Sequence, residues 1–161
     1  MRKIGIEDFP GIIFSNLMKM PFLKPQVKEF YAQRALEYAQ EQGDTIHVLA
    51  RLVDLEKMYK KNKDTRKYAR VLFQQEKALI SICNDFKRAK RNYKTYSRGR
   101  SQLKQYEMEL AKTRVDIAKV IIKSNPKQAK IILEKAKTTF EREERQKEVD
   151  FVNLMLSGIN V

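Results

Sequence analysis

The chain has 161 residues, with 34 lysines and arginines against 20 carboxylates and a net charge of +14 at pH 7. Only five glycines, four prolines and no tryptophan are present, which argues against a β-sandwich because that fold needs many turns. The single cysteine, Cys83, excludes an internal disulfide, and with the single histidine, His47, it excludes an ordinary zinc site. We therefore expect a single all-α domain, residues 1–161, that binds a partner without a metal or cofactor.

The first 25 residues are apolar and broken by proline. Residues 9–23 are interrupted by Pro10, Lys19 and Pro21, so they fall short of the roughly 20 apolar residues that cross a bilayer. Acidic residues and Pro10 follow Met1 too closely for a secretory signal. We expect a cytoplasmic protein without a transmembrane segment, in which residues 1–25 form an apolar docking segment that begins with a short helix near Pro10.

Apolar residues then recur at steps of three and four, the period of a helix that is buried on one face. A helix is expected over residues 26–42 and is ended by Gly43, which suits a left-handed backbone. Asp44 or Thr45 can cap the next helix. From residue 64 an apolar stripe continues to Tyr96 without glycine or proline, and predicts a helix about 50 Å long.

The last third of the chain contains two interruptions. In residues 97–101, Gly99 is expected just beyond a helix end and Ser101 at the start of the next helix. Asn125-Pro126 predicts the start of a final helix. Its residues 141–148 have no apolar face, so we expect residues 141–161 to project as a helix end with an apolar tip. The result is an all-α fold of five to six helices in antiparallel pairs.

The apolar tip is expected to be covered by other parts of the protein. Its candidate interface residues are Phe151, Val152, Met155 and Leu156. They pose the same problem as the apolar residues near the N-terminus, because both groups need cover from water. One hypothesis is that the two ends pack together, either within one chain or across a homodimer.

Small residues recur at matched positions in two expected helices. The spacing Ala-x₃-Leu-x₂-Ala occurs at Ala32, Leu36 and Ala39 and again at Ala129, Leu133 and Ala136. Over about residues 26–140 this pattern resembles the tetratricopeptide repeat, and "ALEYAQEQGD" resembles the longer repeats of bacterial peptide-sensing regulators. The resemblance implies a concave, right-handed superhelix that grips a peptide or a partner helix. Because the repeat period is not kept, a bundle built around a long helical hairpin is the alternative.

Positive charge is concentrated in the middle of the chain. Residues 57–104 contain 16 lysines and arginines and three carboxylates, a net charge of +13, whereas the rest of the chain carries +1. On one helix Lys87, Arg91, Lys94 and Arg98 share a face and are spaced like cations that follow a phosphate backbone. The expected partner- or polyanion-binding residues are Lys60, Lys61, Lys63, Arg66, Lys67, Arg70, Lys87, Arg88, Arg91, Lys94, Arg98 and Arg100.

These basic residues form two groups along the chain, one around the turn at Asp64 and one near Arg98–Arg100. The two groups merge into one surface if the turn folds beside Arg98–Arg100. A long helix would instead separate them by roughly 45 Å. The sequence is compatible with either arrangement.

No carboxylate pair, glycine-rich phosphate loop or nucleophile motif indicates catalysis, so we do not expect an enzyme. Cys83 shares a stripe with Ile82 and Phe86 and is interpreted as a small core residue. The first hypothesis is a non-enzymatic adaptor or regulator whose basic central surface binds an acidic or helical protein. The alternative is a nucleic-acid-binding protein that contacts phosphates through residues 57–104, largely without reading sequence.

Overall fold

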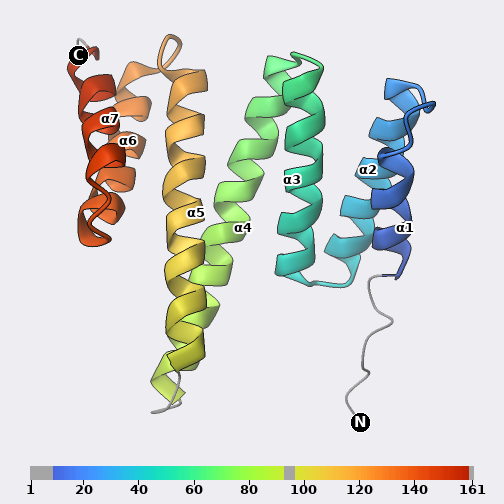
Figure 1. The fold of residues 1–161 in the computed structure, drawn as a ribbon, viewed down its shortest axis with the longest axis horizontal. Coiled ribbons are helices and arrows are strands. Elements are labelled where there is room, and N and C mark those ends of the chain that lie inside the picture. The colour runs from blue at the N-terminus through green and yellow to red at the C-terminus, as the bar shows by residue number, and fades with distance from the viewer. Residues whose placement is uncertain (1–8, 93–96, 160–161) are drawn as a thin grey trace. The chain divides into compact units, whose positions relative to one another are not determined.

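The computed structural model describes residues 9–92 and 97–159. Within these ranges it contains seven helices and no strand, which confirms the all-α class with a helix count slightly above the five to six expected. The helices are α1 (Phe9–Met18), α2 (Pro25–Glu41), α3 (Thr45–Lys61), α4 (Thr65–Asn92), α5 (Ser97–Ile121), α6 (Pro126–Arg142) and α7 (Gln146–Ser157) (Figure 1). Among the described helices, none combines the length and the hydropathy that crossing a membrane requires.

The chain divides into two compact units between Gln74 and Gln75. The first unit contains α1, α2, α3 and the start of α4, and the second contains the rest of α4 with α5, α6 and α7. The expectation of a single domain stays a prediction.

Three of the connections are tight turns of three residues. They span residues 42–44, 62–64 and 143–145. The middle residue of each is left-handed: Gly43 has φ 70°, Lys63 has φ 57° and Glu144 has φ 55°. This conformation costs glycine little, but it costs other residues about 1 kcal/mol. Turns this short favour antiparallel neighbours, and α2 packs on α3 and α6 on α7.

Polar side chains mark the starts of three helices. The Asp44 carboxylate accepts hydrogen bonds from the backbone N–H groups of Ile46 (3.0 Å) and His47 (3.1 Å) at the start of α3. Asn125 accepts one from the N–H of Gln128 (3.1 Å) at the start of α6, where Pro126 is the first helical residue. The Asp64 carboxylate accepts a hydrogen bond from the backbone N–H of Lys67 (3.0 Å) at the start of α4. The caps expected at Asp44 and Asn125 are therefore confirmed.

The core of the first unit is built on small residues of α2. α1 packs on α2, and α2 packs on α3. The buried residues include Ala32, Ala35, Leu36, Ala39, Leu52, Leu55 and Tyr59. The alanines allow close contact between α2 and its neighbours.

Two polar contacts attach α1 to α3 in the first unit. Arg51, whose side chain is 12% exposed, donates from Nη1 to the Gly11 carbonyl (2.9 Å). The Ser15 hydroxyl donates to the Asp54 carboxylate (3.3 Å). The expected apolar segment is thus docked within its own unit from α1 onward.

The second unit has a separate core. α5 packs on α6, and α6 packs on α7. The buried residues include Leu79, Ile82, Cys83, Leu110, Ala111, Ile117, Ala118, Ala129, Leu133, Ala136, Phe140, Val149 and Val152. Cys83 is a core residue, as its stripe indicates.

The expected helix boundary at residues 97–101 is wrong. α5 begins at Ser97, so Gly99 lies in its first turn and Ser101 lies inside the helix. Glycine is tolerated in the first turn of a helix, where the backbone N–H groups have no intrahelical partner. Residues 93–96, which include Tyr93, Lys94 and Tyr96, lie outside the described ranges.

The final helix also differs from expectation, because it is two helices. The left-handed residue Glu144 ends α6 and reverses the chain, and Val149 and Val152 then pack α7 back on α6. The polar stretch 141–148 lacks an apolar face because it contains this turn.

Candidate partner-binding site

The turn between α3 and α4 carries a dense group of exposed cations, which we call the basic turn: Lys60, Lys61, Lys63, Arg66, Lys67 and Arg70. Lys67 is engaged, because its Nζ lies 2.6 Å from Glu29 on α2 and 3.8 Å from Asp64. Within the described ranges, the other five have no carboxylate oxygen within 4.0 Å. Within the part of the chain that the structure describes, their charge is therefore not compensated by a close carboxylate.

Lys67 belongs to a small polar cluster that joins α2, α3 and α4 within the first unit. The Tyr59 hydroxyl donates to Glu29 (3.0 Å) and accepts from the Gln33 amide (3.3 Å). Lys67 Nζ lies over the Tyr59 ring, 5.5 Å from its centroid. Burial first, and then the hydrogen bond and charge of Glu29, raise the pKa of Tyr59 above 10.0. The hydrogen bond to Glu29 raises the pKa of Lys67. Lys67 therefore links α2, α3 and α4, and its place among the expected partner-binding residues stays a prediction.

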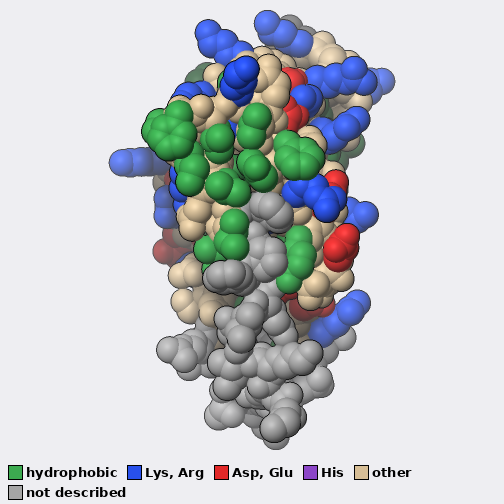
Figure 2. All heavy atoms as spheres, turned by 90° about the vertical axis from the view of Figure 1, so that its right-hand side faces the viewer, with side chains coloured by type: hydrophobic (Ala, Val, Ile, Leu, Met, Phe, Trp, Pro, Cys, Tyr) green, Lys and Arg blue, Asp and Glu red, His purple; other side chains and the backbone are tan. Residues whose placement is uncertain are grey.

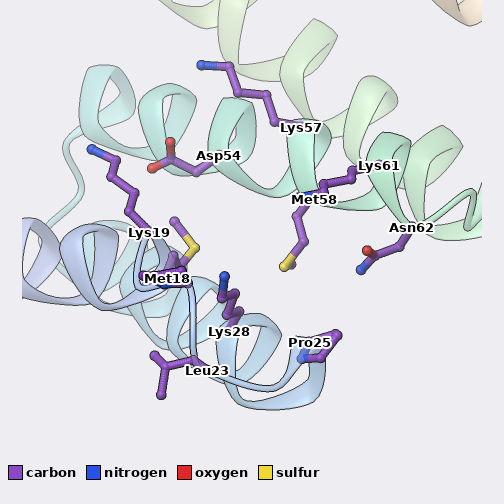
Figure 3. A pocket seen from close by; sticks show the side chains of 11 residues that line it. Met18, Lys19, Leu23, Pro25, Lys28, Asp54, Lys57, Met58, Lys61 and Asn62 are labelled. Carbon is purple, nitrogen blue, oxygen red and sulfur yellow. The ribbon is translucent and has the colours of Figure 1, made fainter.

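A cleft of about 500 Å³ opens beside the basic turn, between α3 and the chain that leads from α1 into α2 (Figure 3). Its apolar lining comes from Met18, Pro21, Leu23, Pro25 and Met58. Figure 3 shows the sulfur atoms of Met18 and Met58 and the ammonium group of Lys28 directed into this space, whereas Lys57 extends away from it. Methionine side chains adapt their shape readily, so they suit a surface that receives an apolar side chain.

The cleft is strongly positive. It is lined by Lys19, Lys28 and Lys61, with Lys57 at its edge and pointing away, against one carboxylate among the described lining residues, Asp54. Asp54 is already engaged by the Ser15 hydroxyl at 3.3 Å and by Arg51 Nη1 at 3.7 Å. The four lysines have no carboxylate partner within the described part of the chain. The start of α2, with Pro25 as first residue, adds the positive end of a helix dipole.

The second group of expected cations is less available. Lys87, Arg88 and Arg100 are exposed. However, Lys87 Nζ lies 3.0 Å from Glu107, which also binds Arg142 at 2.6 Å. The Glu107 side chain is only 15% exposed, so its charge compensates Lys87 effectively. The expected ladder cannot be followed further, because the side chains of Arg91, Lys94 and Arg98 lie outside the described part of the structure.

The two groups of cations belong to different units of the chain. The basic turn lies in the first unit, and Lys87, Arg88 and Arg100 lie in the second. The sequence was compatible with one merged surface or with two separate groups, and both arrangements stay open.

Part of the apolar tip is buried within the second unit. The structure places Val152 in the core and leaves Met155 and Leu156 half-buried. Phe151 is exposed, and Lys119 Nζ lies 5.3 Å from the centroid of its ring. Dimerisation through the chain ends stays a prediction.

Two other side chains could have reactive chemistry, Cys83 and His47, and each interacts with residues of its own unit. Burial, followed by the nearby charge of Glu107, raises the pKa of the Cys83 thiol and disfavours a thiolate. His47 Nδ1 lies 2.9 Å from the Asp44 carboxylate at the start of α3. Among the described residues, no cluster of three or more histidine, cysteine or carboxylate side chains could hold a metal ion.

The basic turn could be predicted from the sequence, whereas the cleft could not. Lys19 and Lys28 do not stand in a run of cations, and Met18 and Met58 lie 40 residues apart. One usable signal was present, because residues 9–28 contain three lysines and no carboxylate. No protein-family model, curated protein or solved structure matches this chain.

Proposed function

We propose that this chain is a non-enzymatic interaction protein whose first unit binds an acidic segment of a protein partner. The observation that carries the proposal is the lysine-lined apolar cleft, whose one described carboxylate is already engaged by Arg51 and Ser15. A site of this kind favours a ligand that offers both negative charge and an apolar side chain.

The binding mode follows from the arrangement of the lining. An apolar side chain of the partner fills the space between Met18 and Met58, and flanking carboxylates meet Lys28 and Lys61. The exposed cations of the basic turn steer the acidic segment toward the cleft and speed its association. Apolar contact then gives the complex selectivity that charge alone does not supply.

The proposal includes the interpretation that the helix pairs resemble tetratricopeptide repeats. Its supporting observations are the burial of Ala32, Ala39, Ala129 and Ala136, and the repeated left-handed turns between helices. In that reading the helix pairs present a partner-binding surface, which suits an adaptor or regulator.

Nucleic acid is the second candidate ligand. Five exposed cations of the basic turn have no carboxylate partner among the described residues, and phosphates would satisfy them equally well. Binding of this kind needs no apolar anchor, and it weakens steeply with salt as counterions are released.

A fluorescence anisotropy titration of the full chain distinguishes the two. The probes are a labelled acidic peptide with one phenylalanine, the same peptide with serine in that place, and a labelled DNA duplex. We expect the phenylalanine peptide to bind about tenfold more tightly than its serine counterpart, because one aromatic side chain becomes buried.

The variants locate the binding site. Removing two charges from the cleft with Lys28→Gln and Lys61→Gln should weaken peptide binding. The matched control, Lys127→Gln with Lys130→Gln on exposed positions of α6, should leave it nearly unchanged. Duplex binding as tight as peptide binding, with no effect of the phenylalanine and a steep salt dependence, would instead support the nucleic-acid function.

A further inference from the structure

A second surface of the first unit is apolar, and nothing in the described structure covers it. On α1, α2 and the segment that connects them, the exposed large hydrophobic residues are Ile12, Ile13, Met20, Phe22, Val27 and Phe30. Phe22 is 80% exposed and Phe30 is 58% exposed. Figure 2 shows hydrophobic side chains gathered on this face, with lysine and arginine side chains above and beside them. We call this surface the α1–α2 face.

The α1–α2 face is distinct from the core of its unit. Ala32, Ala35 and Ala39 of α2 are buried, while Val27 and Phe30, one turn apart, are exposed. A helix that covers a globular core normally presents polar residues on its outer side. On α2 the exposed large hydrophobic residues are confined to the first two turns, at Val27 and Phe30, and farther along the helix the exposed residues are polar, among them Gln33, Arg34 and Glu37. The apolar patch at the start of α2, next to the connecting segment, therefore indicates a surface that something outside the unit covers.

The positive charge around this face indicates that its partner is anionic. Residues 9–28 contain Lys19, Lys24 and Lys28 and no carboxylate. A second copy of the chain on this face would bring like charges together, which opposes self-association. An anionic surface would gain from the same lysines, because their charges are attracted to acidic lipid headgroups.

The shape of the connecting segment favours a bilayer. Phe22 stands exposed on the connection between α1 and α2, flanked by Lys19 and Lys24 and framed by Pro21 and Pro25. A protruding aromatic ring needs a matched pocket on a protein partner, whereas a lipid interface closes around it. Aromatic rings beside basic residues are typical of segments that lie in the headgroup region of a membrane.

We propose that the α1–α2 face docks on the surface of an anionic bilayer. Phe22 and Met20 insert among the headgroups, and Lys19 and Lys24 contact the acidic lipids. This role goes beyond the proposed function. It shares Lys19 with the edge of the cleft, but its inserting residues, Met20 and Phe22, are not part of the cleft lining.

The absence of tryptophan from the chain gives a direct test. F22W introduces a single tryptophan, which can be excited selectively over the seven tyrosines, at an exposed aromatic position, and Ile131→Trp, at a position of α6 that is 53% exposed, is the matched control. Each full-length variant is mixed with vesicles of phosphatidylcholine alone or with added phosphatidylserine. On the anionic vesicles, we expect the F22W emission to shift to the blue and to be shielded from an aqueous quencher, and the I131W emission to stay unchanged.

Vesicle co-sedimentation measures the contribution of the side chain. Phe22→Ala should lower partitioning onto the anionic vesicles about tenfold, and Ile131→Ala should leave it unchanged. Circular dichroism checks that each variant is folded.

Three results would overturn the proposal. One is binding to anionic vesicles without a change in F22W emission, which would show that positive charge elsewhere on the chain drives the binding. Another is a complete lack of vesicle binding. The third is an F22W shift with an acidic peptide but not with vesicles, which would assign the α1–α2 face to a protein partner.

Discussion

The Asp44 carboxylate caps the start of α3, and its pKa differs from the ordinary value. Burial by itself would raise its pKa, but the hydrogen bonds from the His47 and Ile46 backbone and the contact with the His47 imidazole lower it below 3.8. Because the pKa is lowered in the folded state, the contribution to stability is present above pH 3.8 and is lost as the pH falls through the folded value.

Replacing this cap should destabilise the start of α3. We expect Asp44→Ala to lower the free energy of unfolding by about 1 kcal/mol at neutral pH, and the difference to shrink in acid. Urea denaturation of both proteins at neutral and acidic pH measures this. If the two proteins differed equally in their free energy of unfolding at both pH values, the charge of the carboxylate would have no part in the cap.

Tyr59 gives the first unit a dependence on alkaline pH. Its pKa and that of Lys67 are both raised in the folded state, so their contribution is complete below about pH 10 and is lost as the pH rises through the folded values. Tyr59→Phe removes one of the two groups and its hydrogen bonds to Glu29 and Gln33.

We expect this substitution to cost about 1 kcal/mol at neutral pH. Above pH 10.0, the ordinary tyrosine pKa, the variant should lose stability less steeply than the original protein. Denaturation followed by circular dichroism at increasing pH tests this. Parallel curves for the two proteins would exclude Tyr59 as the source of the dependence.

At the scale of the element, a largely buried arginine ties α1 to α3. Arg51 of α3 reaches the Gly11 carbonyl of α1, and its side chain is largely shielded from water. Hydrogen bonds from a charged donor contribute more than neutral ones, about 1.5–3 kcal/mol.

Arg51→Ala should therefore loosen α1 selectively. We expect hydrogen exchange at the α1 amides to become at least about tenfold faster, while exchange in α6 of the second unit stays the same. Exchange measured by mass spectrometry resolves the two helices. Equal acceleration in both helices would mean that the substitution destabilises the whole chain instead of releasing α1.

The helices could be predicted wherever their signals are local. Gly43, Asp44 and Asn125-Pro126 mark boundaries through their own backbone and capping preferences, and the structure bears them out. The break at Glu144 could not be predicted, because a glutamate there adopts the left-handed conformation that usually indicates glycine. Gly99 was misplaced because glycine is compatible with the first turn of a helix as well as with its end.

At the scale of the whole molecule, the candidate site depends on contacts between distant parts of the sequence. The exposed cations of the basic turn could be predicted from local charge. The pairing of Lys67 with Glu29 and of Lys87 with Glu107 could not, because these partners lie on different helices. The cleft likewise forms only when Met18 and Lys28 are brought beside Met58, so its residues carry no joint signal along the chain.

The central claim is that the cleft of the first unit receives an acidic segment with an apolar anchor. Methionine methyl groups report on it directly, because Met18 and Met58 line the cleft, whereas Met108 and Met155 belong to the second unit. The measurement is a titration of the protein, labelled with carbon-13 at its methionine methyl groups, with the phenylalanine-bearing acidic peptide, followed by nuclear magnetic resonance. The account predicts saturable shifts of the Met18 and Met58 resonances, with those of Met108 and Met155 unmoved. Shifts confined to Met108 and Met155, or no shifts at saturating peptide, would contradict it.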